Sequence, residues 1–361
     1  MGFLKNILGK KEKTATSYAE FWNWFQKNER KFFDVVKQKG DIERLFLNPL
    51  SEELKKIKPG FFFLTGMAND NEAELVFTAD GNIKNMVNVE ELVDAAPKIN
   101  GWLFTKHKQA GDFSVQMGNY TFNTQNMHFF ATNNAAYPDE INITIVHDEY
   151  NEADKDAITN GVYIFLDNYL GELTFASTID KLSIAGKNDT QEELIPLDKL
   201  KDYLNWREKE FIEKYEGTRR NTENDGYSAL EGTLQNGKPL IAVVNADLLQ
   251  WDAKPSHPWF LTISIKYPSA NDSGMPDERS YKLMDQIEEE LSAQLQDVDG
   301  YLNVGRETAD GLRQIYFACK DFRKPSSVMQ NIEKEYSQQI DISFDIYKDK
   351  YWQTVARFMQ E

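Results

Sequence analysis

The chain has 361 residues, which is enough for two ordinary domains with hydrophobic cores. Hydrophobic residues make up 41% and aromatic residues 13% of it, so the composition excludes an intrinsically disordered chain. The net charge is −17, and because residues 1–58 carry 13 Lys and Arg against 8 Asp and Glu, the other 303 residues carry a net charge of −22.

This acidic surface repels nucleic-acid phosphates, so we expect no generic binding of DNA or RNA. It could attract a protein partner with a basic surface, and simple solubility also accounts for it. No apolar run approaches the roughly 20 residues that span a bilayer, and no secretory signal is recognised, so we expect a cytoplasmic protein without a transmembrane segment.

A single cysteine, Cys319, excludes a disulfide framework and a cysteine-rich zinc site. It alternates in phase with Ile315 and Phe317, which is typical of a strand face turned toward a core. We therefore predict that Cys319 is a buried apolar side chain and not a nucleophile.

Residues 1–16 are predicted to form a mobile basic tail, and apolar side chains between the lysines of residues 1–13 would allow weak contact with an anionic membrane surface. Residues 17–58 are predicted to form helices that pack on the domain that follows. Ser17 and Glu20 have the spacing of a capping box, and aromatic residues then recur at helical spacing. Such a stripe is more typical of a packing face than of a cofactor site.

Residues 59–215 are predicted to form an N-terminal mixed α+β domain. Short runs rich in β-branched and aromatic residues alternate with turn residues, and segments 154–170 and 197–215 have helical periodicity. Residues 216–226 contain no large apolar side chain, so they cannot bury enough surface to order themselves. We therefore predict a linker over 216–226 and a separate C-terminal domain over residues 227–361.

The C-terminal domain is expected to open with a hairpin at Asn236-Gly237, the strongest short turn signal in the chain. A strand over 259–265, a helix over 276–296, a hairpin over 301–319, a second helix and a last strand follow. This order, βαββαβ, predicts a ferredoxin-like α+β sandwich, and the whole chain is assigned to the α+β class.

The stretch from Gly305 to Arg313 reads as a hairpin tip that carries two arginines and a threonine. Several short motifs accompany it in a fixed order: Gly237-Lys238-Pro239, Pro258-Trp259, Gly274-Met275-Pro276, Ile287-Glu288, Leu291, Gly305-Arg306, Thr308, Gly311, Arg313 and Tyr316. In this order they resemble a bacterial family catalogued as domain of unknown function 695, over about residues 222–350. Residues 17–170 resemble an uncharacterised N-terminal extension found with this domain. The resemblance implies a fold for the C-terminal part and no chemistry.

Four residues of this region are the candidates for binding: Arg306, Thr308, Arg313 and Tyr316. Arg306 alternates in phase with Leu302 and Val304, and Arg313 alternates in phase with Ile315. Both arginines are therefore expected to point toward one apolar face near the hairpin tip.

An arginine on an apolar face needs a partner, because an unpaired buried charge is costly. Two interpretations stay open. In the structural one, the guanidinium groups form ion pairs with Glu288, Glu289 or Asp310. In the functional one, they form a site for a small anion, since a guanidinium binds a carboxylate or phosphate with two parallel hydrogen bonds.

No residue is assigned a catalytic role, and no cofactor or metal is expected, because the common catalytic and nucleotide-binding motifs do not occur. His147-Asp148-Glu149 could supply metal ligands, but adjacent residues on a strand point to opposite faces, so a solvated turn is predicted instead. The sequence therefore favours a non-catalytic cytoplasmic interaction or regulatory module. The alternative is an enzyme or small-anion-binding protein that uses Arg306 and Arg313. The sequence indicates neither the partner nor the oligomeric state.

Overall fold

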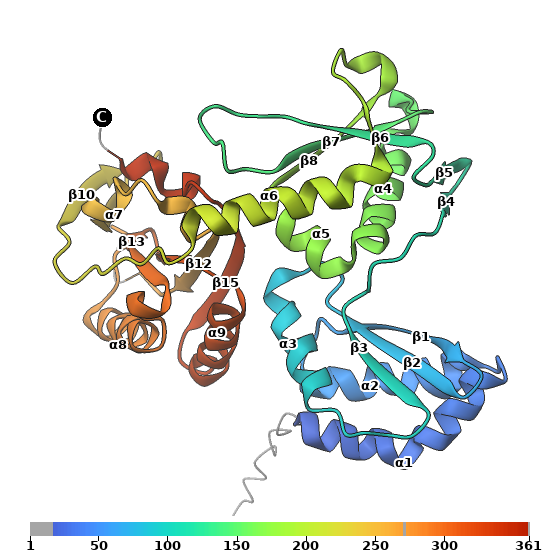
Figure 1. The fold of residues 1–361 in the computed structure, drawn as a ribbon. Helices are drawn as coiled ribbons and strands as arrows, with labels where there is room; N and C mark the ends of the chain where they lie inside the picture. Colours follow the sequence, from blue (N-terminus) through green and yellow to red (C-terminus); the bar gives the residue numbers. More distant parts are fainter. Residues whose placement is uncertain (1–16, 270–271, 360–361) are drawn as a thin grey trace, which may run out of the picture. The chain divides into compact units, whose positions relative to one another are not determined.

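The computed structural model describes residues 17–269 and 272–359 and shows an α+β protein, which confirms the predicted fold class (Figure 1). The predicted basic tail, including the proposed membrane contact by residues 1–13, lies outside the described residues. Within the described part of the chain, no helix is both long enough and apolar enough to cross a membrane.

Contacts between residues divide the chain into two compact units. Of the described residues, the first unit contains 17–80 together with Asn88–His107, and the second contains Gly81–Val87 together with those from Lys108 on. This division cuts through the predicted domain 59–215. The predicted linker at 216–226 stays a prediction about independent folding, which limited proteolysis can test.

The first unit packs helices on a small sheet. Its elements are α1 (Tyr18–Lys37), α2 (Asn48–Ile57), β1 (Phe62–Asn69), β2 (Glu72–Thr78), the later turns of α3 (Ile83–Asp94) and β3 (Trp102–Lys106), with strand order β1-β2-β3. Ser17 and Glu20 form the predicted capping box at the start of α1. Phe21 and Trp22 of α1 are buried against Phe77 of β2, so the aromatic stripe is a packing face.

The second unit begins with helices packed around a four-stranded sheet of order β8-β7-β6-β9 and a short hairpin, β4-β5. The elements are β4 (Val115–Met117), β5 (Tyr120–Phe122), β6 (Met127–Ala131), β7 (Asn142–His147), α4 (Lys155–Leu170), α5 (Glu172–Thr178), β8 (Lys181–Gly186), β9 (Ile195–Pro196) and α6 (Leu200–Tyr215). The sequence predicted the helices that became α4 and α6 but missed α5.

A six-stranded antiparallel sheet follows, of order β10-β11-β13-β14-β12-β15. Its elements are β10 (Tyr227–Thr233), β11 (Pro239–Asn245), α7 (Ala246–Leu249), β12 (Trp259–Lys266), α8 (Glu278–Gln294), β13 (Tyr301–Ala309), β14 (Leu312–Cys319), α9 (Arg323–Tyr336) and β15 (Asp341–Lys348). The elements from β12 to β15 follow the chain order βαββαβ, and the hairpin β10-β11 adds two strands to this sheet next to β13.

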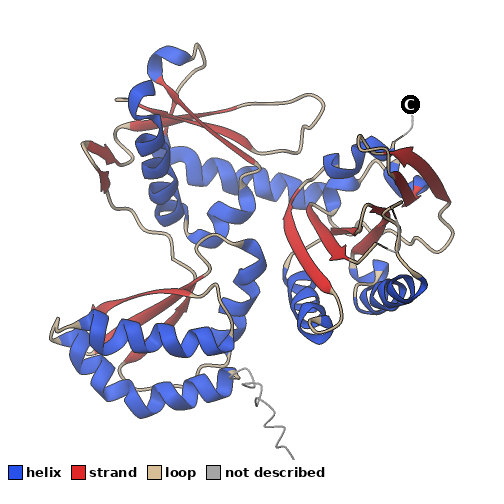
Figure 2. Cartoon of the chain, turned by 180° about the vertical axis from the view of Figure 1, so that it is seen from behind, coloured by secondary structure: helices blue, strands red, loops and turns tan. Residues whose placement is uncertain are grey.

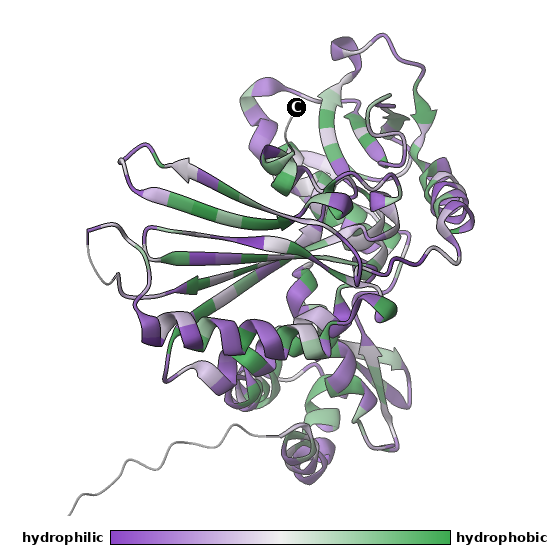
Figure 3. Ribbon diagram, turned by 90° about the vertical axis from the view of Figure 1, so that its left-hand side faces the viewer, coloured by the Kyte–Doolittle hydropathy of each residue, from purple (hydrophilic) through white to green (hydrophobic). Residues whose placement is uncertain are grey.

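The two faces of the six-stranded sheet are covered differently. Helices α8 and α9 lie side by side on one face, which we call the helix face (Figures 1 and 2). The opposite face packs on α7 and on a 3-10 helix at Gln353–Phe358, with Phe260 and Tyr316 in its core. Hydrophobic and hydrophilic residues alternate along the helices and strands, as elements with one buried face require (Figure 3).

A β-bulge in β13 decides which side chains reach the helix face. The register shifts between Asn303 and Gly305, so Leu302 lies opposite Ala318 whereas Arg306 lies opposite Ile315. Leu302 therefore points to the opposite face and Arg306 to the helix face, and the predicted phase relation between them is wrong.

Close packing between backbones explains why the bulge contains glycine. Gly305 has φ +145°, a conformation that other residues rarely adopt. A Cβ atom built on it would lie 2.5 Å from the carbonyl oxygen of Val243 in β11.

Candidate functional site

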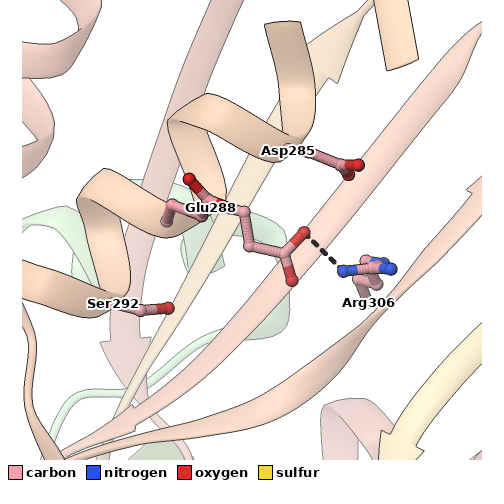
Figure 4. A pocket seen from close by; sticks show the side chains of 5 residues that line it. Asp285, Glu288, Ser292 and Arg306 are labelled. Carbon is pink, nitrogen blue, oxygen red and sulfur yellow. Dashed lines mark hydrogen bonds and ion pairs between the residues drawn. The ribbon is translucent and has the colours of Figure 1, made fainter. Parts of the chain in front are cut away.

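Arg306 and Arg313 lie on the helix face and both reach side chains of α8. Nη1 of Arg306 donates a hydrogen bond of 2.8 Å to Oε2 of Glu288 (Figure 4). Nη1 of Arg313 donates one of 3.0 Å to Oδ1 of Asp285 and lies 3.9 Å from Oε2 of Glu288. The two guanidinium groups and two carboxylates thus form one ion-pair network between β13, β14 and α8.

Burial differs between the two arginines. The side chain of Arg313 is 2% exposed, whereas that of its partner Asp285 is 37% exposed. The guanidinium of Arg313 also lies 5.1 Å from the ring centroid of Tyr281, which provides a cation–π contact. Arg313 is therefore held by the sheet, by α8 and by an aromatic ring.

The observed partners match the structural interpretation only in part. Glu288 is one of the three predicted carboxylates, but Asp285 was not predicted. Asp310 lies at the tip of the hairpin, where it accepts a hydrogen bond of 2.8 Å from Nδ2 of Asn236 and forms an ion pair with Lys238. It therefore joins two hairpin tips instead of neutralising an arginine.

Thr308 and Tyr316 are separated by the sheet. Thr308 lies opposite Arg313 in the ladder, and its Oγ1 accepts a hydrogen bond of 3.2 Å from Nε of Arg313. Tyr316 lies opposite Gly305 and belongs to the core of the opposite face. The structure thus brings Arg306, Thr308 and Arg313 together and places Tyr316 elsewhere.

On the opposite face Tyr316 has its own charged partners. Its hydroxyl donates a hydrogen bond of 2.8 Å to Oε1 of Glu307, and Nη2 of Arg357 donates to the same carboxylate oxygen over 2.7 Å. Burial, with Glu307 beside it, raises the pKa of Tyr316. Oε2 of Glu307 is buried without a hydrogen-bond partner among the described residues. No local sequence pattern connects Arg357 or Glu307 to Tyr316, so neither residue was predicted to belong to its surroundings.

An open hollow of about 460 Å³ lies beside the arginine network along α8. Its lining residues are Asp285, Glu288, Glu289, Ser292 and Arg306 (Figure 4). The four residues from α8 occupy positions i, i+3, i+4 and i+7, so they share one side of the helix. Three carboxylates against one guanidinium make this hollow more suitable for a cation than for an anion.

The strands β10 and β11 carry an apolar strip on the helix face that is open to solvent. We call it the open strip; it consists of Tyr227, Ala229, Ile241 and Val243. Tyr227 is 56% exposed and Ile241 is 44% exposed. Val243 lies opposite Arg306 and Ile241 opposite Thr308, so the strip runs directly into the arginine network.

Residues 233–359 match the model of a family of unknown function, DUF695. The match confirms the resemblance that the sequence predicted for the C-terminal part, and it contains all four candidate binding residues. No curated protein and no solved structure matches the chain.

Several residues that carry the DUF695 resemblance have structural roles at the tips of the hairpins. The amide of Gly311 donates a hydrogen bond of 2.8 Å to the carbonyl oxygen of Gly274. Both glycines have positive φ, and a Cβ on Gly274 would lie 2.7 Å from Cα of Asp310. These motifs therefore join the β13–β14 tip to the loop before α8, which places α8 over the arginines.

Two other potentially reactive side chains of the second unit, Cys319 and His147, are buried within the fold. Cys319 is fully buried, as predicted, and burial raises the pKa of its thiol. Nε2 of His147 lies 3.0 Å from the carbonyl oxygen of Thr121, and its Nδ1 accepts a hydrogen bond of 3.2 Å from the amide of Glu149. Among residues 17–269 and 272–359, no group of three or more His, Cys, Asp or Glu side chains could hold a metal ion.

Proposed function

We propose that this protein is a non-catalytic cytoplasmic interaction module that binds a partner with a basic, amphipathic surface. The contact would use the open strip together with the carboxylates of α8. The supporting observation is the exposed apolar strip beside an acidic helix on one face of the six-stranded sheet.

The open strip has the character of a protein-binding surface. Helices α8 and α9 lie on the helix face, whereas large side chains of β10 and β11 on this face are exposed. Tyr227 and Ile241 lie on neighbouring strands and point to the same face. Apolar side chains that gather in one exposed patch with a polar rim are typical of interaction sites. A partner helix lying next to α8 would cover them.

Charge favours a basic partner. The three acids that line the hollow, Asp285, Glu288 and Glu289, outnumber the two arginines of the ion-pair network, so these five groups carry a net charge of −1. An exposed Glu231 lies opposite Ile241 in the β10–β11 ladder and adds another negative charge beside the strip. Lysines or arginines along the rim of a partner helix would complement these carboxylates and speed association.

The alternative function, binding of a small anion by Arg306 and Arg313, has less support. Each guanidinium already donates to a carboxylate of α8, and the hollow beside them is lined mainly by acids. An anion would have to displace Glu288 or Asp285, and it would meet Glu289 in the hollow. The geometry therefore supports a structural network that positions the acidic side of α8.

Fluorescence anisotropy with two labelled helical peptides tests the proposed function. Both peptides carry the same apolar face, and their polar face is either lysine or glutamate. We expect the lysine peptide to bind the full chain more tightly than the glutamate peptide, and high salt to weaken its binding. Ile241→Glu and Glu289→Lys should each weaken binding of the lysine peptide at least fivefold.

A matched control separates the proposed surface from general attraction to an acidic protein. Ile164 on α4 is 43% exposed, close to the 44% of Ile241, so Ile164→Glu adds the same charge at an equally exposed isoleucine. We expect Ile164→Glu to bind the lysine peptide like the wild type. Equal weakening by Ile164→Glu and Ile241→Glu, or equal binding of both peptides, would contradict the proposal.

A further inference from the structure

A second cavity in the second unit has a basic lining. It measures about 250 Å³ and lies where α5 and α6 meet the ends of β12, β14 and β15. Its charged lining residues are Glu208, Lys320, Asp321, Arg323, Lys348 and Lys350. It contains neither arginine of the DUF695 hairpin, so it is a different site from the one described above.

Two lysines at the end of β15 share a single carboxylate. Nζ of Lys348 lies 3.1 Å from Oδ1 of Asp180, and Nζ of Lys350 lies 2.7 Å from Oδ2 of the same residue. Lys348 also donates to the carbonyl oxygen of Thr178, and Lys350 donates to that of Asp139. Lys350 is buried and Lys348 largely so, which leaves one positive charge of this pair without a carboxylate of its own.

Two more cations complete the basic side of the cavity. Lys320 follows β14 and is exposed, and Arg323 begins α9 with its guanidinium 4.6 Å from the ring centroid of Phe322. Counted together with Glu208 and Asp321 of the lining and with Asp180, the four cations give these seven groups a net charge of +1. This sign is opposite to the net charge of −17 of the whole chain.

Apolar side chains form the rest of the wall. Trp259 and Phe322 pack with ring centroids 4.9 Å apart, and Phe211 lies under Nζ of Lys350 at 4.5 Å. Ile212 is exposed at the mouth. The volume is slightly below the range of roughly 300–1,000 Å³ that is typical of sites for drug-sized ligands. A ligand that fits would be small, with one anionic group and an apolar body.

We propose that this cavity binds a small organic carboxylate, with the anionic group near Lys348 and the apolar body against Trp259 and Phe322. A carboxylate suits the site because Lys348 and Lys350 share the single carboxylate of Asp180, so a second carboxylate would balance the pair and accept a hydrogen bond from the ammonium group of Lys348. The aromatic wall would exclude water from the ligand body, which strengthens the charge interaction.

The proposal predicts a specific pH dependence of binding, because Lys348 must be protonated to attract the carboxylate. Burial, together with the neighbouring charge of Lys350, lowers the pKa of Lys348 to about 8, although Asp180 opposes this shift. The other charged groups that line the cavity are Glu208, Lys320, Asp321 and Arg323. A bound carboxylate would favour the charged amine, so binding should take up protons near pH 8 and weaken by about tenfold between pH 7 and pH 9.

Isothermal titration of the full chain with benzoate, at pH 7 and pH 9, tests the proposal. We expect a Kd of about 1 mM or tighter at pH 7 for a ligand of this size. Lys320→Met, at the exposed rim, should weaken binding several-fold without unfolding the protein, and Lys348→Met should also remove most of the pH dependence. Lys324→Met is the control. Lys324 follows Arg323 in α9 but pairs with Asp299 and does not line the cavity.

The outcomes are distinct. If Lys348→Met does not fold, Lys320→Met compared with Lys324→Met still decides the question. Absence of benzoate binding at pH 7, or equal weakening by Lys320→Met and Lys324→Met, would overturn the proposal and leave the lysines as an ion-pair network around Asp180. Inorganic phosphate serves as a second probe, and tighter binding of phosphate than of benzoate would overturn the choice of a carboxylate with an apolar body.

Discussion

Replacing Arg313 with methionine should destabilise the second unit. Methionine keeps most of the apolar volume of the arginine stem, so the change removes mainly the guanidinium group. This group donates to Asp285 over 3.0 Å and to Oγ1 of Thr308 over 3.2 Å, and it lies near Glu288. Its loss would leave two carboxylates at the helix face with only Arg306 between them.

The size of the effect follows from the burial of the partners. Removing one member of a buried ion pair costs about 3–5 kcal/mol. Asp285 is more than one-third exposed, so water can solvate its carboxylate after the change, and we expect a smaller loss of about 2–4 kcal/mol. For Arg306→Met we expect about 1–2 kcal/mol, because Arg306 is itself partly exposed and Glu288 keeps Arg313 at 3.9 Å.

Thermal and urea unfolding of the wild type and the two variants measure these losses. In a unit of this size, 1 kcal/mol corresponds to a change in Tm of about 2–4 °C, so Arg313→Met should lower Tm by about 4–16 °C. Lys282→Met is the control, since Lys282 forms an exposed ion pair with Glu278 on the same helix and should change stability by less than about 0.5 kcal/mol.

The same scans in phosphate or a small carboxylate separate the two interpretations of the arginines. If the guanidinium groups form an anion site, they repel each other in the empty protein, and Arg313→Met would leave stability unchanged or raise it while abolishing protection by the anion. That combined result would refute the structural interpretation of the network.

Three further predictions concern the linker, the acidic surface and the bulge. Limited proteolysis should cut the described part of the chain first within 216–226 and leave a stable fragment that begins near Gly226, whereas preferred cleavage inside 259–348 would count against this division. Because of its acidic charge, the protein should not bind random duplex DNA at moderate ionic strength. Tight, salt-sensitive binding of such DNA in an anisotropy assay would contradict this prediction. Gly305→Ala should destabilise by more than about 2 kcal/mol in urea unfolding, because it combines backbone strain with a clash, and Gly66→Ala, where the new Cβ meets no atom within 4 Å, should change stability much less.

Much of the fold could be predicted because the signals are local. Ser17 and Glu20 cap α1 with groups three residues apart, and Asn236-Gly237 turns one strand directly into the next. The grouping of Arg306, Thr308 and Arg313 also results from local sequence signals. The turn at Asp310-Gly311 pairs Thr308 with Arg313, and strand alternation then places Arg306 on the same face.

The predicted site failed where it depended on distant parts of the chain. Tyr316 is an odd number of strand positions from Arg313, so its side chain lies on the opposite face of the sheet, where it contacts Glu307 and Arg357. The strand pattern therefore could have excluded Tyr316 from the arginine site. The contribution of Arg357 could not have been found, because it comes from a short helix after β15.

The sequence by itself determined the α+β class, the main helices and the hairpin that carries the arginines, since these depend on periodicity, caps and turns. Only the tertiary structure decided which charges meet. Asp285 reaches Arg313 because α8 lies across the sheet, and Asp180 meets Lys348 across 168 positions of sequence. The bulge at Gly305 depends on how closely the backbone of β11 approaches. Such pairings result from packing between elements, and a local residue pattern does not record them.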